Sequence, residues 1–153
     1  MPWTNLTNAA HTRLWEHLNN LYAALMPGPR HYAATVDAEN VASGTTLATI
    51  VIPAQPFACR IGLRYGGMVG YVSTGATVAA SVAASAGTIT TTCPGANAYT
   101  PAGGVWVEYE YNGYVTLAAG TATTLTLGSY STPGTSYFRG MFTADVLFVG
   151  EYA

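Results

Sequence analysis

Lysine is absent from this chain of 153 residues, and charged side chains of every kind are scarce. Five arginines and seven acids make up 8% of the residues, whereas soluble domains carry about 25%. A compact monomer of 15.9 kDa exposes roughly 7,000 Å² of surface, which leaves about one charge per 600 Å². So few charges predict that much of the outside is covered by copies of the same chain or by a larger assembly.

The same scarcity argues against two classes of partner. Five scattered arginines in a chain of net charge −2 form no basic stripe for nucleic acid. No apolar run approaches the length of a membrane span, and the start of the chain, MPWTNLTNAAHTR, lacks the basic, apolar and small-residue order of a signal peptide. We therefore expect no nucleic-acid partner, no membrane insertion and synthesis in the cytoplasm.

Cysteine is rare too, and the sequence offers no sign of a cofactor. Cys59 and Cys93 are the only two. Cys59 falls in the apolar register of strand 57–65 together with Phe57, Ile61 and Leu63, which favours a buried free thiol. A disulfide stays open if strands 57–65 and 88–93 are neighbours and the assembly matures in an oxidising medium. The histidines share no ligand spacing with the cysteines, and nucleophile-elbow, zinc-protease, phosphate-loop and dinucleotide-binding patterns are absent. We expect no enzyme, no metal and no cofactor.

The residues that are present divide into two segments, of which the first is helical. Within residues 4–25 four leucines recur at spacings of four, three and four, as in the seam of a coiled coil. They are Leu14, Leu18, Leu21 and Leu25. His11 belongs to the same seam, where its symmetry copies would meet at a bundle axis, unless it faces solvent. A helix this short needs a partner surface, which is either its own domain or, as we prefer, the stems of other copies, formed by residues 1–26.

A linker of two prolines around a glycine, residues 27–31, leads into a second segment, residues 32–153. This segment contains short stretches rich in β-branched or alternating residues, separated by Gly, Pro, Ser and Thr. The stretches are 46–52, 57–65, 68–74, 76–84, 88–92, 105–111, 114–118, 121–127, 136–142 and 144–152. Their number predicts a mainly β fold, an antiparallel β-sandwich or jelly roll of about eight to ten strands behind a short N-terminal α-helix.

The stretch VWVEYEYNGYVTL, residues 105–117, places two acids, Glu108 and Glu110, on one face of a strand. Their spacing overlaps that of the carboxylates in glycosidases, but strand alternation already explains them as the solvated side. The pair Asn112-Gly113 predicts a type I′ hairpin turn directly after this strand. Three aromatic residues are expected in the core or between subunits. They are Trp106, Tyr109 and Tyr111.

An N-terminal helix, the break MPGPR and a Thr/Ala/Gly-rich β domain ending in YFRGMFTADVLFVGEY follow one another along the chain. This layout resembles that of small virion proteins of tailed bacteriophages, in which a helical stem leads into a trimeric jelly roll of tumour-necrosis-factor-like shape. The resemblance implies a non-enzymatic virion protein, a homotrimer that decorates the capsid and contacts the major capsid protein or another virion protein. The alternative is a tail-tip or fibre protein that binds a receptor or a carbohydrate such as a host-surface glycan.

Overall fold

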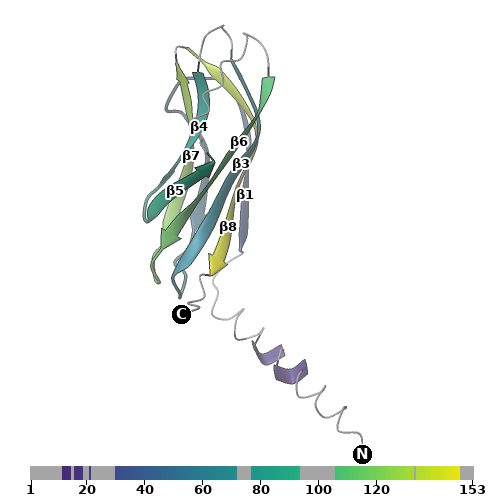
Figure 1. The fold of residues 1–153 in the computed structure, drawn as a ribbon, viewed down its shortest axis with the longest axis vertical. Coiled ribbons are helices and arrows are strands. Elements are labelled where there is room, and N and C mark those ends of the chain that lie inside the picture. Colours follow the sequence, from purple (N-terminus) through teal and green to yellow (C-terminus); the bar gives the residue numbers. More distant parts are fainter. Residues whose placement is uncertain are drawn as a thin grey trace, which may run out of the picture.

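A computed structural model of the chain describes residues 12–14, 16–18, 21, 30–71, 77–93, 106–132 and 134–148. In these residues two antiparallel sheets pack as a β-sandwich, and a short helix precedes them (Figure 1). The predicted fold class, mainly β with one N-terminal helix, is confirmed.

Eight strands make up the two sheets. They are β1 (His31–Val41), β2 (Thr46–Ile52), β3 (Cys59–Tyr71), β4 (Thr77–Ala84), β5 (Thr88–Cys93), β6 (Trp106–Leu117), β7 (Thr123–Thr132) and β8 (Ser136–Phe148). The larger sheet has the order β1-β8-β3-β6-β5 and the smaller one the order β2-β7-β4. β4 and β5 are edge strands.

The pairing of the strands is nested. β1 pairs with β8, β2 with β7 and β3 with β6, which is the pairing of a jelly roll, where one long folded ribbon wraps into two sheets. β5 departs from this scheme because it pairs with β6 in the larger sheet and not with β4. The nesting brings strands that are far apart in the sequence into one sheet.

The core lies between the sheets and follows the alternation of each strand. Cys59, Ile61 and Leu63 are buried on β3, as predicted. Phe57 was expected in the same row, but it is half exposed because β3 begins only at Cys59. Other strands of both sheets supply further large, fully buried side chains. Among these are Ile52, Leu125, Leu127, Phe138 and Phe142.

Two predicted turns lie inside strands instead. Asn112-Gly113 sits in the middle of β6, which pairs with β3 without interruption from Trp106 to Leu117. Neither residue has the positive φ that a type I′ turn requires, so the hairpin prediction is wrong. Gly66-Gly67 likewise lies within β3, paired with β6 on one side and β8 on the other. Pairing along both edges of a long strand outweighs the local turn preference of these dipeptides.

A tyrosine lies beside each of these strand glycines on the inner face of the sheet. Tyr65 and Gly67 are two residues apart on β3, as are Tyr111 and Gly113 on β6, and the two tyrosines are directly opposite each other. The hydroxyl of Tyr65 donates to the carbonyl of Met68, 3.3 Å away, so its side chain runs along the strand past Gly67. The ring of Tyr111 occupies the space beside Gly113, where an added Cβ would lie 3.1 Å from the hydroxyl oxygen of Tyr111, and it supports the strand there.

β1 is a strand that the sequence pattern did not reveal. The linker was expected to reach His31, but β1 begins at that residue and pairs with β8 up to Val41. Asn40 has a φ of 55°, and the register shifts between Ala38 and Val41. β8 also joins two stretches that were expected as separate strands.

Candidate functional site

The described residues of the N-terminal segment are helical, as predicted. Leu14, Leu18 and Leu21 leave 55%, 45% and 48% of their surface exposed, and the helical turns stand apart from the sheets (Figure 1). This part of the leucine seam is therefore not packed on the chain's own sandwich, one of the two alternatives that the sequence leaves. His11 and Leu25 lie outside the described residues. No helix within those residues is long and apolar enough to span a bilayer.

The charges of the sandwich gather on the outer side of the larger sheet. Among the described residues they all lie on β1, β3, β6 and β8, except for Arg30 directly before β1. They are His31, Asp37, Glu39, Arg60, Arg64, Glu108, Glu110, Arg139 and Asp145. We call this surface the charged face. The strands of the smaller sheet, β2, β4 and β7, contain no charged residue and no histidine.

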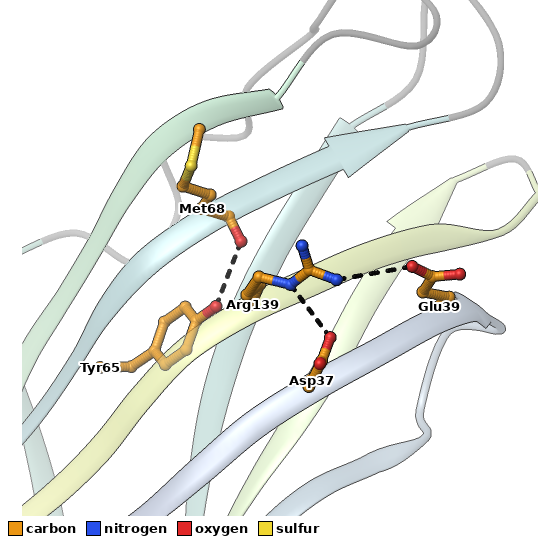
Figure 2. Close-up of polar contacts among 5 residues, drawn as sticks. All are labelled: Asp37, Glu39, Tyr65, Met68 and Arg139. Carbon is orange, nitrogen blue, oxygen red and sulfur yellow. Dashed lines mark hydrogen bonds and ion pairs between the residues drawn. The ribbon is translucent and has the colours of Figure 1, made fainter.

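Arg139 on β8 is the centre of one ion-pair group on the charged face. Its Nε donates to Oδ1 of Asp37 at 3.1 Å, and its Nη2 lies 3.6 Å from Oε1 of Glu39 (Figure 2). Both acids stand on β1, the neighbouring edge strand. All three side chains are more than half exposed, so each pair contributes at most about 1 kcal/mol to stability. The group therefore contributes little to the stability of the fold, and its main effect is to hold these charges at fixed positions on the surface.

Glu108 and Glu110 lie on the charged face of β6, as strand alternation predicts. Glu110 accepts a hydrogen bond from Nε of Arg64 at 2.9 Å, whereas Glu108 stands opposite Met68 on β3 and has no ion pair among the described residues. Both acids are exposed on an open sheet, while glycosidases place their carboxylates on either side of the sugar. The arrangement is that of a solvated sheet face.

Trp106, Tyr137 and Arg139 form an aromatic cluster at one end of the charged face. The rings of Trp106 and Tyr137 have centroids 5.8 Å apart, and Cζ of Arg139 lies 5.4 Å from the centroid of Trp106. The two rings meet across Gly70, where an added Cβ would lie 3.5 to 3.6 Å from both. Tyr137 also donates to Oδ1 of Asn40 at 3.0 Å. Trp106 is thus half buried on the outside of the sheet and not in the core.

Sequence reasoning missed Tyr137 and Arg139 as partners of Trp106. The alternation in SYFRGMF does place Tyr137, Arg139 and Met141 on the face opposite Phe138 and Phe142, which is what the structure has. That signal identifies the face. It cannot identify the neighbouring strands, because β6 and β8 meet around β3 only through the nested pairing.

Tyr109 and Tyr111 are core residues. Both are buried, and the hydroxyl of Tyr109 accepts a hydrogen bond from the N–H of Ala80 at 3.1 Å and donates to its carbonyl at 3.3 Å. Ala80 belongs to β4, which has a strand neighbour on one side only. Tyr109 therefore satisfies backbone groups that a further strand would otherwise bind, and it ties the two sheets together.

Cys59 is a buried free thiol, as the sequence favours. The condition for a disulfide is not met, because β6 lies between the strands of Cys59 and Cys93. The side chain of Cys93 is outside the described residues. Burial raises the pKa of the Cys59 thiol. No group of three His, Cys, Asp or Glu side chains in the described ranges could hold a metal ion.

No protein-family model matches this chain, and no curated protein matches it in sequence.

Proposed function

We propose that this chain is a non-enzymatic structural protein of a virion, a homotrimer that decorates the capsid of a tailed bacteriophage. The observation that carries the proposal is the exposed leucine seam of Leu14, Leu18 and Leu21 ahead of a jelly roll. Leucines at heptad spacing reach a stable state by packing against other helices. The nested strand pairing agrees with the layout of helical stem and trimeric jelly roll that the chain resembles.

The distribution of charge supports a structural role as well. Acids and arginines of the sandwich are exposed and largely paired along an open sheet. An active site would gather such groups in a concave, partly desolvated place, where their pKa values shift. Twelve charges on 153 residues suit a protein whose surface is shared with other subunits.

The stem is tested by the double substitution L18D/L21D. Aspartates in the seam would face each other across the helices and dissociate them, so light scattering should give the mass of one chain where the wild type gives three times its 15.9 kDa. T12D/R13D is the matched control, since it adds two aspartates to the same helix outside the seam. An L18D/L21D protein that keeps the wild-type mass would show the stem hypothesis to be wrong.

The location is tested by electron microscopy of virions with gold-labelled antibodies against the sandwich. Label spread over the head supports decoration of the capsid. Label confined to the tail tip or fibres refutes the capsid proposal in favour of a receptor-binding role, and virions without label refute both.

The aromatic cluster of Trp106, Tyr137 and Arg139 favours a second candidate, a carbohydrate-binding protein of the tail. Half-exposed aromatic rings beside charged and amide groups are suited to sugars, which offer apolar ring faces and hydroxyls. On a glycan array, binding by the wild type that W106A abolishes would support it. Y130A, on the other sheet, is the control and should bind as the wild type does. A wild type that binds no glycan on the array would count against this candidate.

A further inference from the structure

The outer side of the smaller sheet is uncharged from one edge to the other. We call it the neutral face. Its side chains are Thr49, Val51, Ala79, Ser81, Ala83, Thr124, Thr126, Gly128 and Tyr130, which the strand register places on one side. Val51 and Tyr130 are 62% and 46% exposed. Val51 lies opposite Thr124, so about 20 Å of β7 separates it from Tyr130, and the residues between are small.

The edges of this sheet are uncharged too. Natural edge strands prevent pairing with other chains by means of charged residues, prolines or bulges. β2 and β4 contain neither a charged residue nor a proline, and the register shift near Thr46 is the one bulge within the described residues of this sheet. A monomer would leave this neutral surface to water without the devices that keep sheets apart.

The chemistry of the face also restricts what can cover it. The face offers hydroxyls but no charge, so a charged group placed against it would lose its water without gaining an opposite charge, and a neutral partner surface fits it better. Among the sheet faces that the structure describes, the same face of another copy is such a surface, and the charged face is not. The charged face does carry exposed apolar side chains, Met68, Met141 and Leu147, and it is the competing surface.

We infer that copies of this chain contact one another through the neutral face. The inference rests on the proposed homotrimer and adds the surface that its sandwiches bury. It leaves the charged face, with its ion pairs and aromatic cluster, to other components of the virion or to a receptor.

The test compares V51R with M141R in the full chain. Val51 and Met141 are both exposed apolar residues, at 62% and 49%, on opposite faces of the sandwich. An arginine can extend into water at either place in the isolated chain, so folding should change little. Sedimentation equilibrium should show a dissociation constant raised roughly 100-fold by V51R, because the buried charge would have no partner, and left within about threefold by M141R.

The stem could hold V51R chains together, so a second measurement reports on the face itself. Single cysteines, V51C and M141C, are introduced with C93S and labelled with a maleimide dye; Cys59 is fully buried. V51C should react at least about tenfold more slowly in the wild-type stem than in the L18D/L21D stem, while M141C should react equally fast in both.

The outcomes separate this inference from the proposed function. V51C labelled equally fast in both stems, or M141C protected in its place, would overturn the neutral face as the contact while the trimer stands. A wild type that sediments as a single chain at every concentration would overturn the trimer and the inference together.

Discussion

Gly67 on β3 and Gly140 on β8 stand opposite each other on the inner side of the sheet. A Cβ added at Gly67 would lie 2.2 Å from the carbonyl oxygen of Arg139 and 2.7 Å from Cα of Gly140. At Gly140 it would lie 2.4 Å from the carbonyl oxygen of Gly66. All of these neighbours are backbone atoms of a paired strand, which cannot rotate away as a side chain can. We therefore expect G67A to force the two strands apart.

The magnitude follows from two opposing effects. Replacing glycine by alanine in a strand stabilises by about 0.5–1 kcal/mol, because the unfolded chain loses freedom. Overpacking that moves backbone costs about 1–3 kcal/mol and occasionally more, and a contact of 2.2 Å belongs at the upper end. The net loss in the free energy of unfolding should be about 2 kcal/mol, which lowers the melting temperature by about 4–8 °C in a chain of this size.

G62A is the matched control on the same strand. Gly62 faces outward, and its added Cβ would meet the nearest atoms at 3.9 Å, an ordinary van der Waals contact. G62A should therefore equal or exceed the wild type in stability. Urea unfolding followed by tryptophan fluorescence, at one fixed protein concentration, measures all three proteins. A G67A protein as stable as G62A would refute the reasoning from strand approach.

Two further predictions concern buried groups. Burial, with Tyr109 as a lesser cause, raises the pKa of Tyr65. Because the pKa is about 10 in the unfolded chain and higher in the folded protein, the free energy of unfolding is unaffected by this group below pH 10 and falls as the pH rises above 10. Y65F should therefore lower the free energy of unfolding by about 1 kcal/mol at pH 7, because it loses the hydrogen bond to Met68. It should also reduce the fall in stability above pH 10, whereas Y130F, at an exposed position, should have neither effect. An unchanged pH dependence in Y65F would contradict this. Cys59 has a raised pKa and no exposed surface. In native C93S protein it should therefore not react with a thiol reagent, while in guanidinium it should react fully. Rapid reaction of the native protein would contradict this and show that the strand of Cys59 opens.

Strand alternation was the part of the structure that the sequence predicted best. It placed Cys59, Ile61 and Leu63 inside, and it separated Glu108 and Glu110 from Tyr109 and Tyr111. These predictions are confirmed because alternation is local: successive side chains of a strand point to opposite faces whatever its neighbours are. The helical stem pattern was recognisable for the same reason.

The limits of strands were predicted poorly. Asn112-Gly113 and Gly66-Gly67 have the composition of turns, yet both continue through long strands. The turn preference of a dipeptide contributes little free energy compared with the backbone hydrogen bonds of a strand that is paired along both edges, as β3 is between β6 and β8. β1 was missed because HYAATVDAENV carries few large apolar residues, and its place depends on β8, more than 100 residues later.

The sequence by itself determined that this protein has few charges, a β-sandwich fold and a leucine seam, since composition and periodicity are properties of the chain alone. The tertiary structure alone decided where the few charges lie. β1, β3, β6 and β8 are separated in the sequence by uncharged strands, and nested pairing sorts them into one sheet and leaves the other sheet neutral. Long-range pairing also brought Trp106 to Tyr137 and Arg139. Such neighbours depend on which strands pair, and that is settled by the packing of the whole domain.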